Sequence, residues 1–295
     1  MVDESTLASW TGPSSDTEQE KQDRTERMIR QAVDDHPAFD DCRLQVFAKG
    51  SYANNTNVRT DSDVDVAVEC QDVVYWKEAE QGLHDPGTPY TGPWTPEMLR
   101  QELTAALEAK FPEQVDTTGS VAIAVNASTA RVEADVVPCF SYVYYLKGGG
   151  TRTGTKIFPT DRRGFENFPD QQLANGRTKN RATGRAFKKT VRILKRVANR
   201  MTSEDYHREV PSYFVECLVY NCPNHVLERP TWTSTVKGVL AHIWDDLEGE
   251  EPDAQGDRWL EVNECFFLFH DAQKWSREDA RDFAYAALNY LGFGS

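Results

Sequence analysis

The sequence has no apolar run of the roughly 18 residues that a membrane-spanning helix needs. Its N-terminal stretch also lacks the basic and apolar regions of a signal peptide. It contains no CxxC pair, and its six cysteines have no spacing typical of a disulfide framework. Together these absences predict a cytoplasmic protein with reduced thiols and no membrane partner.

Zinc ligands are also scarce. Cys217, Cys222 and His225 could contribute to a zinc site, but no fourth ligand is apparent, so buried or surface thiols are the preferred interpretation.

Basic residues are outnumbered, with 33 Lys and Arg against 47 Asp and Glu, which gives a formal net charge of −14. This balance argues against a surface that binds long nucleic acid nonspecifically. An acidic protein can still bind a polyphosphate where its basic residues are gathered locally. The distribution of charge is therefore more informative than its sum.

Hydrophobic periodicity predicts an α+β fold, with a mixed-sheet lobe over residues 1–165 and a helical lobe over 166–295. The first fifteen or so residues are expected to be frayed, and 148 to about 180 to be a long loop-rich stretch. The predicted strands cover 44–50, 64–68, 121–125, 131–137 and 140–145. The predicted helices cover 17–35, a segment from Thr95, and 182–201, 212–220, 234–247, 259–269 and 276–291.

Two carboxylates follow a Gly50-Ser51 turn and lie in an alternating strand, Asp63-Val-Asp65-Val-Ala-Val68. Because side chains alternate along a strand, Asp63 and Asp65 share one face, about 7 Å apart, while the valines point into the core. Two carboxylates this close favour a cation between them. Their oxygen atoms are ligands of the kind that suits Mg²⁺ or Mn²⁺. The Gly50-Ser51 turn would offer backbone N–H groups and a hydroxyl to a triphosphate.

A third carboxylate is expected from another strand. Asp135 alternates against Ala134 and Val136, and Glu133 on the same face is the second choice for a supporting role. Three carboxylates could hold two metal ions for in-line displacement at phosphorus. The plainer alternative is that Asp63 and Asp65 form a solvated strand end. It explains neither the preceding Gly-Ser turn nor the later strand.

These residues resemble the DNA polymerase β-type nucleotidyltransferase superfamily, whose signature is hG[GS] followed by DhDh. Within it, the chain is similar to the bacterial CD-NTases, relatives of cyclic GMP-AMP synthase and oligoadenylate synthase. The resemblance implies a nucleotidyltransferase lobe, a helical lobe and an active site in the cleft between them. It makes Asp63, Asp65 and Asp135 the catalytic metal ligands.

The segment from Arg177 to Arg200 contains no acidic residue. Within it, Phe187, Val191, Leu194, Ala198 and Met201 form an apolar helical stripe. A basic stripe runs beside it, formed by Arg185, Lys188, Arg192 and Lys195. Charges of one sign favour a polyanion site over an ordinary solvated face. The resemblance implies that Lys195 contacts the triphosphate, with Lys188 and Arg192 beside it.

The next helix opens with Pro211-Ser212-Tyr213-Phe-Val-Glu216. This stretch is similar to a Ser-[Tyr/Phe]-x-x-Glu element of the family, in which the serine reaches phosphate and the aromatic ring stacks on a base. The alternative is an ordinary helix cap followed by core aromatics.

The resemblance implies a cytoplasmic enzyme that uses NTPs (ATP, possibly GTP, CTP or UTP) to make a cyclic di- or trinucleotide second messenger. Pyrophosphate is released, and the product activates an effector protein in CBASS-type antiphage defence. We expect a monomer. The alternatives are nucleotidyl transfer to an RNA 3′ end, a small molecule or a protein, and a nucleotide-binding regulator. The cysteine and histidine zinc module of cyclic GMP-AMP synthase is missing, so activation by double-stranded DNA is not expected.

Overall fold

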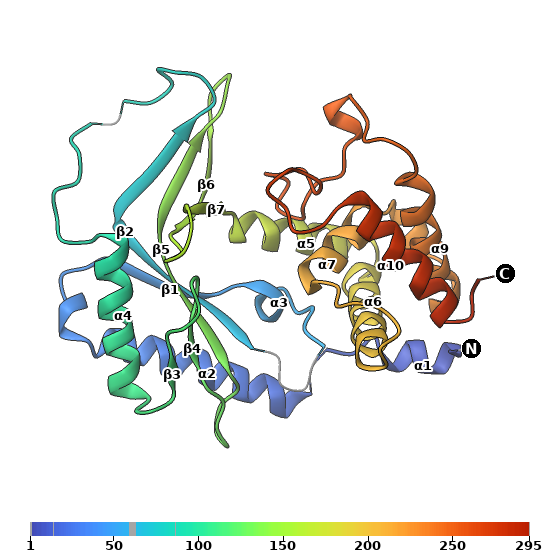
Figure 1. Ribbon diagram of the computed structural model, residues 1–295, viewed down its shortest axis with the longest axis horizontal. Helices are drawn as coiled ribbons and strands as arrows, with labels where there is room; N and C mark the ends of the chain where they lie inside the picture. The colour runs from blue at the N-terminus through green and yellow to red at the C-terminus, as the bar shows by residue number, and fades with distance from the viewer. Residues whose placement is uncertain (1, 14, 59–62, 86, 295) are drawn as a thin grey trace. The chain divides into compact units, whose positions relative to one another are not determined.

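The computed structural model describes residues 2–13, 15–58, 63–85 and 87–294, and these fall into two compact units (Figure 1). The sheet unit contains Ser15–Tyr52 and Arg59–Pro169. The helical unit contains Met1–Ser14, Ala53–Val58 and Asp170–Ser295. Residues 53–58 therefore belong to the helical unit although both flanking segments belong to the sheet unit. A boundary at residue 165 between independently folding domains stays a prediction.

The sheet unit is built on one mixed sheet with the strand order β1-β2-β5-β4-β3. These strands are β1 (Leu44–Ala48), β2 (Val64–Glu78), β3 (Val115–Asp116), β4 (Ile123–Val125) and β5 (Ala134–Tyr145). β2 pairs with β5 in parallel and with β1 antiparallel. The mixed sheet confirms the predicted α+β class. The valine alternation also predicted β2 correctly, but this strand runs ten residues past the predicted end at Val68.

β5 joins two segments that were predicted as separate strands, 131–137 and 140–145, and the prediction of a break was wrong. Pro138 lies between the two predicted segments, and proline cannot donate a ladder hydrogen bond. In the structure, one edge of β5 pairs with β4 up to Val136 and with β6 (Thr151–Ile157) from Cys139 onward. Pro138 lies in the interval between these two partners, where an N–H group is not required.

The stretch predicted to be loop-rich, 148 to about 180, is more regular than expected, since it contains β6, β7 (Phe165–Asn167) and most of α5 (Pro169–Ala182). Gly148–Gly150 form the connection between β5 and β6, which pair antiparallel. Gly154 lies within β6. Its missing Cβ is required there, because a Cβ would lie 2.4 Å from the Asn167 carbonyl oxygen on β7.

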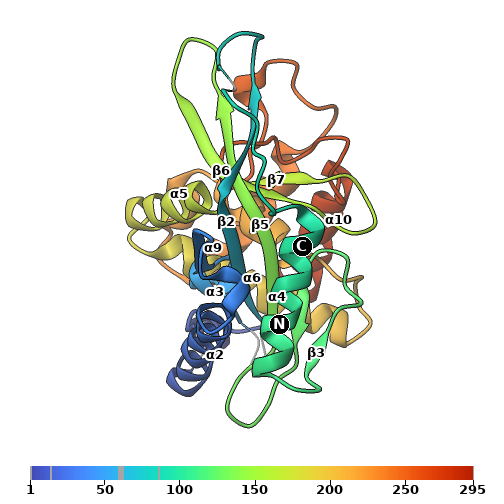
Figure 2. The ribbon, with the colours of Figure 1, turned by 90° about the vertical axis from the view of Figure 1, so that its left-hand side faces the viewer.

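One face of this sheet is covered by α2 (Asp16–Asp34) and α4 (Pro96–Lys110), both near their predicted positions (Figures 1 and 2). Thr95 caps α4 as expected, accepting a hydrogen bond from Met98 N–H. The core beneath these helices includes Val64, Val66 and Val68 of β2. Because side chains alternate, Asp65 and Ala67 project from the opposite face.

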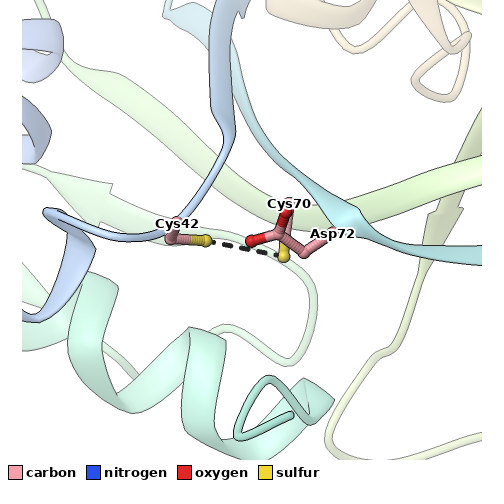
Figure 3. A group of neighbouring side chains, drawn as sticks. All are labelled: Cys42, Cys70 and Asp72. Atoms are coloured by element: carbon pink, nitrogen blue, oxygen red, sulfur yellow. Dashed lines mark hydrogen bonds between the residues drawn. The ribbon is translucent and has the colours of Figure 1, made fainter. Parts of the chain in front are cut away.

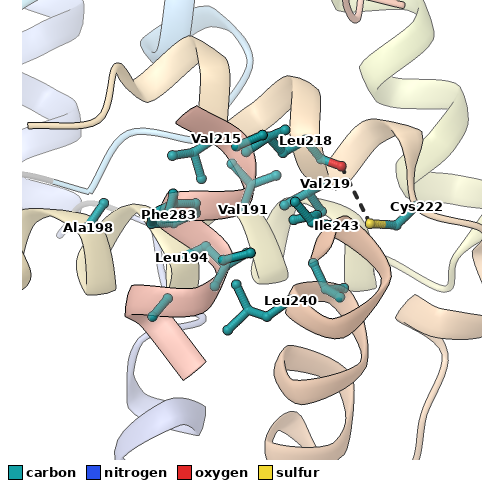
Figure 4. Close-up of a cluster of buried hydrophobic side chains, with 14 of the residues drawn as sticks. Val191, Leu194, Ala198, Val215, Leu218, Val219, Cys222, Leu240, Ile243 and Phe283 are labelled. Carbon is teal, nitrogen blue, oxygen red and sulfur yellow. Dashed lines mark hydrogen bonds between the residues drawn. The ribbon is translucent and has the colours of Figure 1, made fainter. Parts of the chain in front are cut away.

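The helical unit contains α1 (Glu4–Ser9), α6 (Ala186–Ser203), α7 (Ser212–Asn221), α8 (Asn224–Leu227), α9 (Trp232–Asp246) and α10 (Arg277–Tyr290). The predicted apolar stripe of α6 is confirmed, since all of its side chains are buried. Val191 and Leu194 on α6 pack with Leu218 on α7, Leu240 on α9 and Phe283 on α10 in one apolar core (Figure 4).

Two predictions about this unit were wrong. Residues 2–13 are not frayed, because Leu7 on α1 is fully buried and the Glu4 carboxylate accepts hydrogen bonds from the N–H groups of Trp232 and Thr233. Residues 259–269 do not form a helix either. Glu264 there has a left-handed φ of 54°, and Leu260 pairs with Phe267 across a short turn.

Within the described part of the chain, we find no helix that is both long and apolar enough to span a bilayer.

Candidate active site

Asp65 and Asp135 are partners in the register of β2 and β5, so the two carboxylates stand side by side on the sheet. Their strand neighbours Val64, Val66, Ala134 and Val136 are buried in the core beneath α2 and α4. Both aspartates therefore project from the face that these helices leave uncovered. The structure thus brings together two residues that lie far apart in the sequence.

Asp63 lies just before β2 and is exposed. Burial, and then the negative charges of Asp65 and Asp63, raise the pKa of Asp135 above its usual value. The charge of Asp63 therefore acts on Asp135. The contributions of Asp65 and Asp63 to this shift reflect negative charges close to Asp135. We call Asp63, Asp65 and Asp135 the carboxylate site.

Lys49 is a cation at this site that the sequence did not single out. Its Nζ lies 3.7 Å from Asp65 Oδ1, and its backbone N–H donates to the Asp65 carbonyl oxygen. The Lys49 charge also opposes the rise in the Asp135 pKa. The residue precedes the Gly-Ser turn directly, but only the pairing of β1 with β2 could show that it faces Asp65.

Gly50 begins a single helical turn, α3 (Gly50–Ala53), with a left-handed φ of 66°. A Cβ at this position would lie 2.1 Å from Asp65 Oδ2. Glycine therefore leaves the space that the Asp65 carboxylate occupies, and no other residue type would do so. Ser51 follows within α3 and is half-buried.

The carboxylate site is suited to a hard divalent cation, since its donors are all oxygens and its excess negative charge needs compensation. The three aspartates are the residues that could hold Mg²⁺ or Mn²⁺. Among the described residues, only Cys42, Cys70 and Asp72 form a group whose ligand atoms all lie within 4.8 Å of one another, so the three aspartates are spaced more widely than that group.

The Cys42, Cys70 and Asp72 group lies elsewhere in the sheet unit, with the two sulfur atoms 3.7 Å apart (Figure 3). The Arg43 Nε donates to Asp72 Oδ1 at 2.8 Å, which supplies a positive charge to that carboxylate. Three donors and a neighbouring guanidinium make a poor zinc site, since structural zinc takes four ligands. All six cysteines are free thiols, as expected.

The four predicted cations of α6 differ in accessibility. Arg185 is exposed and Lys188 is half-buried, whereas Arg192 is 6% exposed and Lys195 only 2%. The Lys195 Nζ lies 3.6 Å from Glu216 Oε2 and donates to Thr56 Oγ1 at 3.2 Å. Arg192 donates to the carbonyl oxygens of Thr11 and Asn55. The predicted stripe is therefore only partly accessible.

Ser212 is the first residue of α7 and is exposed, and Pro211, not Ser212, occupies the cap position. The serine-cap part of the alternative is therefore wrong, but its core-aromatic part is borne out, since Phe214 is 1% exposed and Tyr213 packs against the same apolar core. Tyr213 is half-buried, and its hydroxyl donates to Glu261 Oε2 at 3.1 Å. The Glu261 carboxylate is buried and also accepts from Asn263 and Gln273. Glu261 and Asn263 were missed because their segment was predicted as a helix, and Gln273 lies just beyond that segment.

Several known proteins resemble the chain over most of its length. Residues 174–292 match the C-terminal helical domain of the cGAS/DncV-like nucleotidyltransferases. The chain is 33% identical to the cyclic dipyrimidine nucleotide synthase CdnE of Cecembia lonarensis, over 98% of both chains. It is 32% identical to the cyclic dipurine nucleotide synthase of Elizabethkingia meningoseptica, again over 98% of both chains.

A structure of Elizabethkingia meningoseptica CdnE cyclic dinucleotide synthase with GTP and Apcpp is similar in fold. It has a TM-score of 0.83 and 31% sequence identity, and the match covers 99% of this chain and 100% of that one. The resemblance inferred from the carboxylate and glycine motifs is thereby confirmed. By sequence and by fold, the chain belongs to the CD-NTase family of cGAS/DncV-like nucleotidyltransferases.

Proposed function

We propose that this enzyme joins two or more nucleoside triphosphates into a cyclic oligonucleotide second messenger at the carboxylate site, with release of pyrophosphate. The observation that carries the proposal is the register of Asp65 with Asp135, beside Asp63 and under Gly50. The relatives' names support the cyclic product. One relative is named for a dipyrimidine product and the other for a dipurine product, so we assign no base specificity to this chain.

Asp63, Asp65 and Asp135 would hold the divalent cations. When bound, these cations neutralise the triphosphate and the charge that develops at the transferred phosphorus. In each transfer a ribose hydroxyl oxygen forms a bond to the α-phosphorus, and the bond between the α-phosphorus and the bridging oxygen of pyrophosphate breaks. Asp135 accepts the hydroxyl proton, a role suited to a carboxylate that stands beside Asp65 at this site.

Nucleotide binding is assigned within each unit separately. In the sheet unit, Gly50 and Ser51 bind phosphate, and Lys49 adds a positive charge near Asp65. In the helical unit, Lys188 and the exposed Ser212 bind phosphate, and the Tyr213 ring contacts a base. Arg192 and Lys195 are buried, so their side chains are less accessible to a nucleotide than the half-buried Lys188.

The experiment supplies all four NTPs, singly and in pairs, with Mg²⁺ or Mn²⁺, and identifies products by mass spectrometry after phosphatase treatment. We expect a phosphatase-resistant cyclic product that requires the metal ion. Asp65→Asn should abolish it, while Asp116→Asn, an exposed aspartate of the same unit, should leave it unchanged. Linear products alone, or label on RNA or protein, would support transfer to another acceptor instead.

The biological setting is proposed from the family. A CBASS-type role requires that the product activates an effector protein, and the chain is proposed to act as a cytoplasmic monomer. Size-exclusion chromatography with light scattering measures the oligomeric state directly.

A further inference from the structure

Lys195 is a buried charge with two internal partners. It lies in the middle of α6, is 2% exposed, and its Nζ contacts Glu216 Oε2 and Thr56 Oγ1 at 3.6 and 3.2 Å. Burial lowers the pKa of the Lys195 ammonium, and the Glu216 charge opposes this change. A lysine ammonium that is buried and paired in this way is not available to bind a triphosphate.

Glu216, on α7, is 1% exposed, and both of its oxygens have partners in residues 53–58. The Asn54 side-chain amide donates to Oε1, and the Thr56 hydroxyl donates to Oε2 at 2.9 Å. A buried carboxylate is stable only when it is paired and hydrogen-bonded. The Lys195–Glu216 pair meets that requirement through residues 53–58, which we call the anchored segment.

The anchored segment is held at further points. The Arg192 Nη1, one turn before Lys195, donates to the Asn55 carbonyl oxygen at 2.7 Å. Gly176 on α5 lies so close that a Cβ would come within 3.0 Å of the Asn54 side-chain oxygen. Asn54 and Thr56 are themselves fully buried. Helices α5, α6 and α7 thus all contact these six residues, which have no regular secondary structure beyond Ala53.

The covalent position of the anchored segment gives these contacts a consequence. It begins two residues after Ser51 and ends five residues before Asp63, so it separates the phosphate turn from the carboxylate site along the chain. We propose that Lys195 and Glu216 are positioning residues, which fix residues 53–58 and thereby restrain both flanking groups. This inference rests on the proposed function and reassigns Lys195 from a triphosphate ligand to a positioning residue.

Lys188 provides the contrast on the same helix. It is half-buried, and no ion pair joins it to another residue of the described ranges. The charges of Glu216, Arg177 and Arg192 act on it, and burial lowers its pKa. Of the two lysines, Lys188 is therefore the one with an uncommitted ammonium.

A double-mutant cycle separates the two roles of Lys195. The variants are Lys195→Met, Glu216→Gln and the combination of both, with Lys188→Met and Lys189→Met for comparison. Each protein is measured for Tm, for the Kd of a non-hydrolysable ATP analogue, and for kcat and KM. Removing one partner of a buried pair leaves an uncompensated charge, so each single variant should lose at least about 5 °C in Tm.

The positioning role predicts that Lys195→Met lowers kcat by roughly tenfold or more with less than about a threefold change in analogue Kd. The double variant should recover most of the lost Tm, because no lone charge remains buried. Lys188→Met should instead weaken analogue binding by roughly tenfold at unchanged Tm. Lys189→Met, which removes the same charge from a neighbouring position on α6, should match the wild type.

A weakened analogue affinity at unchanged Tm in Lys195→Met would overturn the inference, as would a double variant no more stable than the singles. Thr56→Val covers the case in which the single variants do not fold, because it removes one hydroxyl without stranding a charge. It should lower kcat and keep the analogue Kd. If the wild type makes no cyclic product, the proposed function fails, while Tm and analogue binding still test the pair.

Discussion

Asp65 on β2 and Asp135 on β5 are register partners in a parallel pair, each flanked by residues buried in the same core. Packing thus fixes the backbone on both sides of each carboxylate, so the two aspartates cannot separate without disturbing the sheet. The repulsion between them is therefore built into the folded state. This repulsion destabilises the metal-free protein, and a cation bound at the proposed metal site would relieve it.

Asp135→Asn should therefore stabilise the metal-free protein while abolishing synthesis. The folded-state pKa of Asp135 is raised, so the residue favours folding only when protonated, and this contribution is lost as the pH rises through that pKa. At pH 7 the charged group opposes folding, and asparagine removes the charge. We expect an unchanged or higher Tm in EDTA and at least about a 100-fold loss of turnover. A lower Tm would contradict the proposed repulsion.

Metal binding should weaken in acid sooner than an ordinary aspartate would require. Because the pKa of Asp135 is raised above 3.8, protonation starts to compete with the cation at a correspondingly higher pH. Calorimetric titration with Mn²⁺ between about pH 5 and 8 measures this competition. The Asp135→Asn protein is the control, with weaker affinity and a flatter pH profile. An identical profile for both proteins would exclude Asp135 as the titrating ligand.

Gly50→Ala should disrupt the carboxylate site through one methyl group. The added Cβ would lie 2.1 Å from Asp65 Oδ2 and would also be strained at a φ of 66°. Gly249→Ala is a matched control, since Gly249 has a φ of 75° with nothing within 4 Å of its Cβ position.

Both alanine variants should lose about 1 kcal/mol of stability from the left-handed backbone. Only Gly50→Ala should also lose synthesis and metal affinity. Equal activity in the two variants would show that Asp65 can move aside, and would remove the steric argument for glycine.

Thiol reactivity should separate the cysteines by burial. Cys42 and Cys265 are half-buried, whereas Cys70, Cys139, Cys217 and Cys222 are buried. Burial raises the pKa of the Cys139 and Cys222 thiols, which lowers their thiolate fraction further. Maleimide labelling of the native protein should modify Cys265 first and Cys42 more slowly, because the hydrogen bond with Cys70 raises the pKa of the Cys42 thiol. The other four cysteines should react only on unfolding. Peptide mass spectrometry identifies the modified sites, and early labelling of Cys217 would contradict this order.

The local elements of the fold could be predicted from the sequence because their signals are local. Valine alternation predicted β2, the Thr95 cap predicted the start of α4, and spacings of three and four residues predicted the buried stripe of α6. The carboxylate site was predicted residue by residue, since both aspartate strands carry the same alternation. The catalytic roles of these residues stay proposals.

Features that depend on distant partners could not be predicted. Pro138 and Gly154 look like strand breakers until their neighbouring strands are known. The same holds for Lys195, whose sequence surroundings are basic and suggested an anion site. Its partner Thr56 lies 139 residues away, and Glu216 lies on another helix. Sequence periodicity shows which face of a helix is charged, but not whether another segment covers that face.

The anchored segment also constrains how relatives of this protein can diverge. A lysine at position 195 without the glutamate at 216, or the reverse, would leave one charge stranded in the core. Intermediates with a single substitution should therefore be rare, and the two positions should change together, with 54 and 56 adjusting to the new pair. Statistical coupling among positions 54, 56, 195 and 216 across many homologues would show that these positions change together, which a single sequence cannot show.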